Sequence, residues 1–426
     1  MILERIYMND ENEMPEDIVS SLASAVNEEL GENSSESDDS VKEAPKKKHK
    51  FLALKIIIIV LCCVVGAGAF LAFTPPGRRI LVGFATQYMY GNMKKVAPSP
   101  VKVATGSAVS ESAVAESATE KAIEAGESTT VVDNIDMSQM SDTFKNAFHE
   151  EGVYNIVLLG VEGIGADTAS GHTDSIMIAT INTNNKTLGL TSLMRDSYVE
   201  IPGFGGNKIN AAFRDGGVNL LYETIAANYG IRMDGSLLVD FNAFESVIDS
   251  IGGVDIELTE TEANYLNHTN YISKKANRTM VTGWNHMNGN QALGYCRVRY
   301  VSTLDGSHDD MGRTTRHRTV INAIFKKAKS DPTKALSAFN TVLPYLTTDI
   351  KQDNMTAYIA DGLELMLAGK ELRQDRLPQD EAMTLGRVDG KSVVLVDWSL
   401  VKPEMMSFMF GTETASNASE SAINKN

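Results

Sequence analysis

DSIMIATINTNNKTLGLTSL, residues 174–193, consists of two apolar runs separated by a polar segment. The apolar runs are rich in Ile, Leu and Thr, which favours strands, and the segment from Asn182 to Lys186 is typical of a hairpin turn. YNIVLLG, residues 154–160, is another apolar run of strand length. We therefore expect consecutive strands at the start of a folded domain.

The chain beyond this stretch alternates between helical and strand patterns. Helical patterns occur at 209–230 and 242–253, and strand patterns at 236–241 and 254–258. Further helices are expected at 313–330, 333–346 and 353–369, and a late strand at 392–398. Since helices that alternate with strands pack against one sheet, the pattern predicts an α/β sandwich with a central sheet.

Residues 51–73 form an apolar run that precedes this domain. At about 1.5 Å per residue such a run crosses a hydrocarbon core of about 30 Å as a transmembrane helix. A lysine cluster at 46–50 comes before it, so the positive-inside rule places the N-terminus in the cytoplasm and the rest of the chain outside the cell. A cleaved signal peptide is the alternative, but some fifty mostly polar residues precede the run.

Composition divides the rest of the chain. Residues 1–50 have the acidic, polar composition of a disordered cytoplasmic tail, and 74–150 combine a juxtamembrane segment with a low-complexity linker. Residues 151–411 are the expected extracytoplasmic domain, and 412–426 return to a disordered composition. The formal net charge of -16 and the pI of about 5.0 argue against nucleic-acid binding.

Arginines gather in one short stretch of this acidic chain, which predicts a selective anion pocket. GYCRVRYVSTLDGSHDDMGRTTRHR, residues 294–318, contains Arg297, Arg299, Arg313, Arg316 and Arg318. The two arginines of CRVRY share one face if the segment is extended and diverge if it ends a helix.

Arg313 continues the apolar stripe of the helix that it begins. The stripe runs from Ile321 back through His317 to Arg313, so these side chains face inward. A buried guanidinium beside the free N–H groups of a helix start favours an anionic ligand. The alternative is that Asp309 and Asp310 cap the helix and pair with the arginines.

Charged residues also follow two of the expected strands. Arg195 and Asp196 come after the strand that ends near 193, where ligands of α/β sheets bind. Arg195 can brace a phosphate and Asp196 can orient or deprotonate an attacking hydroxyl; a structural pair is the alternative. Glu162 and Asp174 border a Gly-rich loop, where carboxylates beside a phosphate site suit Mg²⁺.

These stretches, in this order, resemble the LytR-CpsA-Psr family of membrane-anchored proteins from Gram-positive bacteria. The similar segments are NIVLLGVE, HTDS, MRDSYVEIPGFGGNKINAAF, VDF, IGGVDIEL, GWNHMNGNQALGYCRVRY and DMGRTTRHR. The resemblance implies a central mixed β-sheet flanked by helices on both faces, a three-layer sandwich preceded by the transmembrane helix, with a hydrophobic groove for a lipid tail.

The resemblance also implies an activity and its residues. Family members transfer an anionic glycopolymer, such as a teichoic acid or capsular polysaccharide, from undecaprenyl pyrophosphate to peptidoglycan, forming a phosphodiester to the muramic acid 6-hydroxyl. It places Mg²⁺ at Glu162 and Asp174. It places Arg195, Arg297, Arg299 and Arg313 at the pyrophosphate. From the residues themselves we add Asp196 to the catalytic residues, and we expect substrate binding by Lys208, Asn210, Arg316, His317 and His172.

The sequence departs from the family pattern at four positions. Glu162 replaces an aspartate, Ile164 and His172 replace arginines, and His317 replaces a glutamine. These changes leave two other functions open: a hydrolase of polyprenyl pyrophosphate, and a polymer-binding or regulatory membrane protein without activity. We expect the transferase.

Overall fold

The computed structural model describes residues 74–95, 135–161, 173–331, 346–412 and 414. The expected transmembrane helix at 51–73, both tails and most of the expected helix at 333–346 lie outside these residues. Within the described part of the chain, no helix has the length and apolar character needed to cross a membrane.

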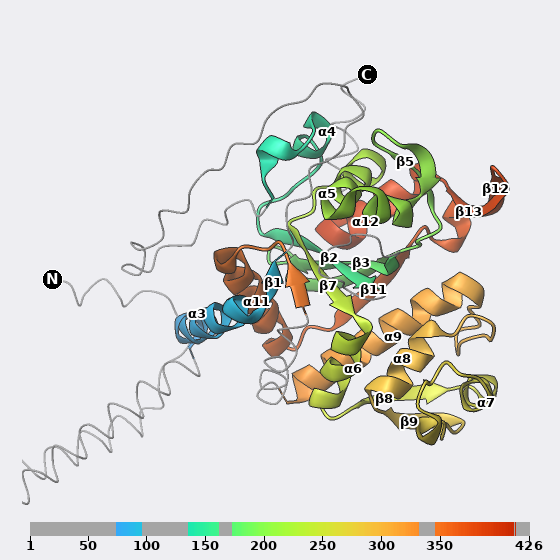
Figure 1. The fold of residues 1–426 in the computed structure, drawn as a ribbon. Coiled ribbons are helices and arrows are strands. Elements are labelled where there is room, and N and C mark those ends of the chain that lie inside the picture. The colour runs from blue at the N-terminus through green and yellow to red at the C-terminus, as the bar shows by residue number, and fades with distance from the viewer. Residues whose placement is uncertain (1–73, 96–134, 162–172, 332–345, 413, 415–426) are drawn as a thin grey trace, which may run out of the picture. The chain divides into compact units, whose positions relative to one another are not determined.

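A seven-stranded mixed sheet forms the centre of the domain (Figure 1). Its strand order is β1-β10-β7-β2-β3-β4-β11, with parallel pairs β1–β10, β7–β2 and β4–β11 and antiparallel pairs elsewhere. The strands are β1 (Lys94–Lys95), β2 (Val153–Val161), β3 (Thr173–Asn182), β4 (Thr187–Leu193), β7 (Gly235–Asp240), β10 (Leu346–Thr348) and β11 (Leu372–Leu377). The predicted hairpin between β3 and β4 is confirmed.

The sheet carries helices on both faces, as the sequence predicted. Side chains of β2 alternate between fully and partly buried along the strand, because successive residues point to opposite faces. On one face, α4 (Asp142–Lys145), α5 (Ile209–Tyr229) and α12 (Trp398–Phe410) form the largest apolar core with the strands. On the other face, α3 (Pro75–Asn92) and α11 (Gln352–Leu367) cover only part of the sheet.

A second group of helices covers the rest of that face (Figure 1). It consists of α6 (Phe241–Ser250), α7 (Glu260–His268), α8 (Gly289–Arg297) and α9 (Asp309–Ser330), with the hairpin of β8 (Val254–Leu258) and β9 (Gly283–Met287). These elements share an apolar core of their own, centred on residues such as Leu266 and Val298. The space between this group and the central sheet therefore becomes a cavity rather than core.

Three short 3₁₀ turns and two hairpins complete the described fold. The turns are η1 (Met137–Gln139), η2 (Lys275–Asn277) and η4 (Asp380–Ala382), and the hairpins pair β5 (Tyr198–Ile201) with β6 (Gly205–Lys208) and β12 (Met383–Val388) with β13 (Lys391–Val396).

The structure adds two facts that the sequence did not predict: the place of a late strand and the start of the folded unit. The strand expected at 392–398 exists as β13, but it belongs to the outer hairpin and not to the central sheet. The folded unit also begins before residue 151, because Phe144 is fully buried in the main core and Lys94 pairs with Thr347. Composition alone did not reveal that parts of 74–150 pack on the domain.

Candidate active site

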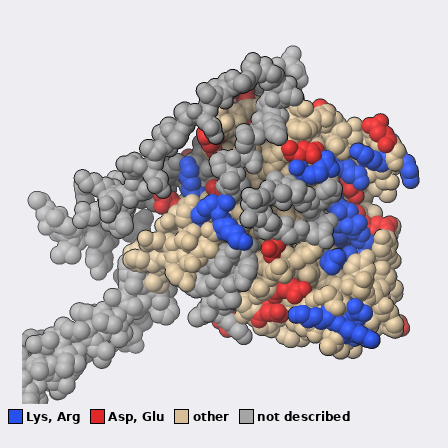
Figure 2. Space-filling view, in the orientation of Figure 1, with Lys and Arg blue, Asp and Glu red and all other residues tan. Residues whose placement is uncertain are grey.

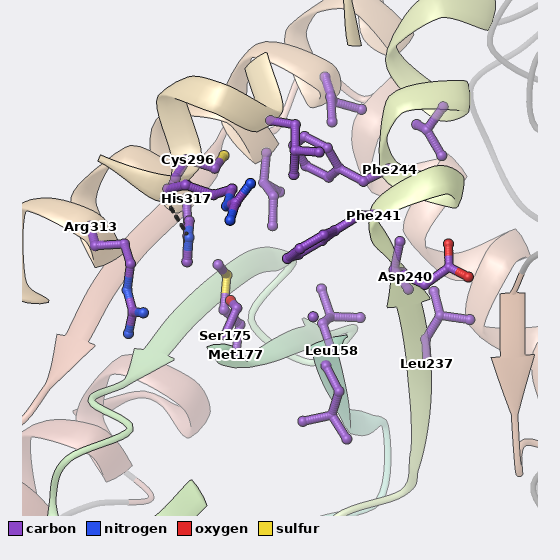
Figure 3. Close-up of a pocket in the computed structure, with 18 of the residues that line it drawn as sticks. Leu158, Ser175, Met177, Leu237, Asp240, Phe241, Phe244, Cys296, Arg313 and His317 are labelled. Carbon is purple, nitrogen blue, oxygen red and sulfur yellow. Dashed lines mark hydrogen bonds between the residues drawn. The ribbon is translucent and has the colours of Figure 1, made fainter. Parts of the chain in front are cut away.

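An apolar pocket of about 510 Å³ lies between the central sheet and the second group of helices. The ends of β2, β3 and β7 supply one wall, and α6, α8 and α9 supply the other. In Figure 3, Leu158, Met177 and Leu237 rise from the strands toward Phe241 and Phe244 of α6. The pocket thus suits a ligand with a long apolar body.

Arginines line one part of this pocket. Arg297, Arg299 and Arg313 all border it, as the sequence predicted. Arg297 is the last residue of α8, the case in which the sequence predicted that the two arginines of CRVRY diverge. Both nevertheless border the pocket, and the extended Val298 between them is buried. The guanidinium of Arg297 lies 5.4 Å above the ring centroid of Phe241, within cation–π range.

Asp310 joins two further guanidiniums of the site. Its Oδ1 lies 2.6 Å from Nη2 of Arg313 and 3.3 Å from Nε of Arg195. Arg313 is 2% exposed, so its charge is largely withheld from water. One carboxylate between two guanidiniums leaves a net positive charge, and with Arg297 and Arg299 this part of the site favours an anion with several charged oxygens.

This arrangement agrees in part with the alternative reading of the helix start. Asp310 does pair with Arg313, one turn along α9, and Asp309 contacts His308 instead. Arg195 lies behind Asp310 and does not border the pocket directly. The sequence offered the pairing of Asp310 with an arginine of its own helix, three residues away, but not its contact with the distant Arg195.

His317 borders the same pocket, and burial and Arg313 lower its pKa to about 3. Its Nε2 lies 3.0 Å from the carbonyl oxygen of Cys296 (Figure 3). A neutral ring that donates to this carbonyl keeps Nδ1 as an acceptor. Burial raises the pKa of the Cys296 thiol to about 12, so it is not a nucleophile at neutral pH.

Arg316 does not bind substrate from its position in the structure, which corrects the sequence expectation. Its side chain is 0% exposed and outside the pocket lining. Nε and Nη2 donate to Oε1 of Glu262 at 3.0 and 2.8 Å, while Nη1 and Nη2 donate to the carbonyls of Val298 and Val301 at 3.1 and 2.8 Å. Arg316 therefore fixes the segment that carries Arg299.

Asp196, Lys208 and Asn210 also lie outside the pocket lining. Nζ of Lys208 is 2.8 Å from Oδ1 of Asp196, so the two charges neutralise each other. The backbone N–H of Asn210 donates to the carbonyl of Arg195 at 3.3 Å. Nε of Arg195 also lies 3.9 Å from Oδ2 of Asp196, so the alternative of a structural pair between these two residues holds, with Lys208 at the start of α5 as a second partner of Asp196.

The predicted metal ligands fall at the edge of the described chain. Glu162 and His172 lie outside the described residues, as does Ile164. The strand register pairs Gly160 with Ser175 and Val161 with Thr173, which leaves Asp174 in a bulge. Gly160 and Ser175 border the pocket, so the bulge lies beside it. Within the described residues, no three His, Cys, Asp or Glu side chains cluster as metal ligands.

The comparisons with known proteins agree with this fold. Residues 107–397 match the LytR_cpsA_psr family. The chain is 31% identical over 206 residues to the polyisoprenyl-teichoic acid–peptidoglycan teichoic acid transferase TagU of Bacillus mycoides, covering 47% of this chain and 62% of TagU. It is 33% identical over 189 residues to the regulatory protein MsrR of Staphylococcus aureus, covering 43% of this chain and 52% of MsrR.

A solved structure shares the same fold. The crystal structure of protein gbs0355 from Streptococcus agalactiae superposes with a TM-score of 0.50 at 21% identity, covering 60% of this chain and 88% of that one. The chain spans less than two thirds of the length of TagU and MsrR. The family match, by contrast, extends over most of the chain, from within the linker to the residue before α12. The protein belongs to the LytR_cpsA_psr family.

Proposed function

We propose that the protein transfers an anionic glycopolymer, of the teichoic acid or capsular polysaccharide type, from undecaprenyl pyrophosphate to peptidoglycan. One observation carries this proposal: an apolar pocket of about 510 Å³ that is bordered by three arginines. A polyprenyl chain fits the apolar walls, and a pyrophosphate suits the guanidinium groups. The name of TagU, a teichoic acid transferase, supports the same chemistry.

The arginines have a direct part in the proposed reaction. The acceptor hydroxyl forms a bond to the phosphorus on the polymer side, the P–O bond to the lipid phosphate breaks, and the proton of the hydroxyl leaves with the lipid phosphate. Negative charge grows on the departing lipid phosphate, and preorganised guanidiniums stabilise that charge. Asp310 keeps Arg195 and Arg313 together against their mutual repulsion, so it is a positioning residue.

Mg²⁺ is the proposed cofactor, with Glu162 and Asp174 as its protein ligands. Its binding beside the pyrophosphate would add charge neutralisation there. The bulge at Asp174, next to the pocket-lining residues Gly160 and Ser175, supports this placement. Carboxylate and phosphate oxygens are the ligands that Mg²⁺ prefers.

The protein's proposed location is the cell membrane, with one pass at residues 51–73. The N-terminus is then cytoplasmic and the catalytic domain extracytoplasmic, where both the lipid carrier and peptidoglycan are available. The apolar run and the preceding lysine cluster support this topology.

Replacement of Arg297 by alanine tests the function. Arg297 is exposed, so its loss leaves the core intact, while the loss of a charge-assisted contact of about 1.5–3 kcal/mol lowers transfer by about tenfold or more. The assay follows labelled lipid-linked polymer onto peptidoglycan, with exposed Arg387→Ala as the matched control. Unchanged transfer by Arg297→Ala would overturn the proposal.

Product analysis in the same assay separates the competing activities. Label joined to glycan supports transfer, whereas free polymer phosphate alone identifies a hydrolase. Lipid pyrophosphate binding without either product would identify a binding protein.

A further inference from the structure

Helix α9 borders a second cavity on its other side. The apolar pocket is lined by Arg313 and His317, whereas Thr315, Arg318 and Thr319 border a separate cavity of about 340 Å³. The helical period turns these two sets of side chains to different faces. The cavity therefore adjoins the candidate active site without being part of it.

The walls of the second cavity are polar throughout. Beside the three residues of α9, they comprise Asp305, Gln374, Asp375, Arg376 and Gln379. Figure 2 shows basic side chains gathered on the side of the molecule where α9 approaches the β12–β13 hairpin, with acidic side chains among them. Arg318 and Arg376 are balanced by Asp305 and Asp375. A site for a free polyanion would carry surplus positive charge, so this balance favours an uncharged, hydroxyl-rich ligand.

Two buried atoms of this cavity have no hydrogen-bond partner among the described residues. They are Nη1 of Arg318, a donor, and Oε1 of Gln379, an acceptor. The remaining groups are fixed, because Nη2 of Arg318 donates to Oγ1 of Thr315 at 3.2 Å and Nε2 of Gln379 donates to Oδ2 of Asp375 at 3.3 Å. This hydrogen bond orients the amide of Gln379, and its Oε1 has no hydrogen-bond partner among the described residues.

A sugar ring carries groups that are complementary to both leftover atoms. Each hydroxyl both accepts and donates a hydrogen bond, so adjacent hydroxyls can meet a guanidinium donor and an amide acceptor together. A buried polar group without a hydrogen-bond partner raises the free energy of the folded protein, so a ligand that supplies the partner gains binding free energy. Burial and the neighbouring Arg376 also lower the pKa of Arg318 to about 10, as expected for two guanidiniums held close together.

The second cavity is connected to the arginines of the active site. Nη1 of Arg376 lies 3.8 Å from Sδ of Met194, and Met194 immediately precedes Arg195. Arg195 in turn contacts Asp310, which holds Arg313 at the first pocket. Packed side chains therefore link the residues of the second cavity to the arginines of the first pocket.

We infer that the second cavity binds a sugar ring of a glycan that reacts at the arginines, with Arg318 and Gln379 as its ligands. The inference rests on the proposed function. Two sources share this chemistry, namely the peptidoglycan acceptor and the sugars nearest the pyrophosphate of the donor.

Binding of a neutral disaccharide to the full chain in detergent micelles tests the inference. The probe is N,N′-diacetylchitobiose, measured by calorimetry. Gln379→Leu removes the acceptor, and Arg318→Lys keeps the charge but removes Nη1; each is expected to weaken disaccharide binding by about tenfold. Gln352→Leu and Arg387→Lys, at positions outside both cavities, are the matched controls.

A second ligand keeps this test independent of the proposed function. Binding of geranylgeranyl pyrophosphate to the apolar pocket is expected to change by less than about twofold in both variants, since separate sites act independently. In the transfer assay, a higher KM for peptidoglycan assigns the cavity to the acceptor, and a higher KM for the lipid-linked polymer assigns it to the donor. No disaccharide binding by the unchanged protein, or binding unaffected in both variants, overturns the inference even if transfer is observed.

Discussion

Arg316 shows how one residue supports the site without touching the ligand. It heads the fully buried side chains by volume in the described structure, and Glu262 is its counter-ion. Glu262→Gln leaves the guanidinium without a compensating charge and is expected to lower the free energy of unfolding by about 3 kcal/mol. Urea unfolding measures this loss. Glu260→Gln, an exposed change in the same helix, serves as control, and equal stability of both variants would contradict the assignment.

His317 gives the fold a pH-dependent contribution. Its pKa falls from 6.5 to about 3 in the folded protein, so the unfolded chain binds this proton more readily. The contribution is complete above pH 6.5 and is lost as the pH falls toward 3, with a slope of at most about 1.4 kcal/mol per pH unit. His317→Gln is expected to flatten the difference in stability between pH 6.5 and pH 4. Identical pH profiles of the two proteins would show that the ring is not held neutral.

The sequence could predict Arg313 but not the role of Arg316. Arg313 continues an apolar stripe, which is a local pattern, and it does border the pocket. The partner of Arg316 is Glu262, 54 residues earlier in the chain, and no local pattern joins them. The sequence therefore predicted which side chains face inward from a local pattern, but not which distant residues contact each other.

At the scale of elements, the close approach of α6 and α8 shapes the pocket. A Cβ added at Gly289 would lie 2.2 Å from the carbonyl oxygen of Glu245, so alanine there forces the two helices apart. α6 begins with Phe241 and α8 ends with Arg297, the cation–π pair of the pocket. Gly289→Ala is expected to cost about 1–3 kcal/mol of stability.

The Gly289→Ala change should also weaken binding of a polyprenyl pyrophosphate. Thermal unfolding and lipid titration measure the two effects. Gly91→Ala is the matched control, because nothing lies within 4 Å of a Cβ added at Gly91. Lipid binding unchanged in Gly289→Ala would separate the helix contact from the pocket.

Elements with a strong local pattern were predicted, and elements without one were missed. The alternating β2 and the long α5 were both expected close to their observed bounds. β11 has the sequence LRQDRL and lies at a sheet edge, where few side chains need to be apolar. α8 contains two glycines, and at Gly294 a Cβ would meet Ile272 at 2.7 Å, so packing demanded residues that disfavour helix prediction.

At the scale of the whole molecule, the proposed topology has its own test. With one pass at 51–73, a tag at the N-terminus is expected to resist protease added to intact cells, while a tag at the C-terminus is cleaved. The lysine cluster at 46–50 is the reason for this orientation. Permeabilised cells, in which both tags are accessible, provide the control. A protected C-terminal tag in intact cells would reverse the topology.

The order of strands in the central sheet has a consequence for biosynthesis. β10 and β11 cover the outer edges of β7 and β4, yet they come from residues 346–377. A nascent chain emerging N-terminus first keeps both edges open until its last fifth appears, and open edges recruit other strands. Premature stop codons before residue 372 should therefore yield aggregates or degraded fragments rather than a smaller folded protein.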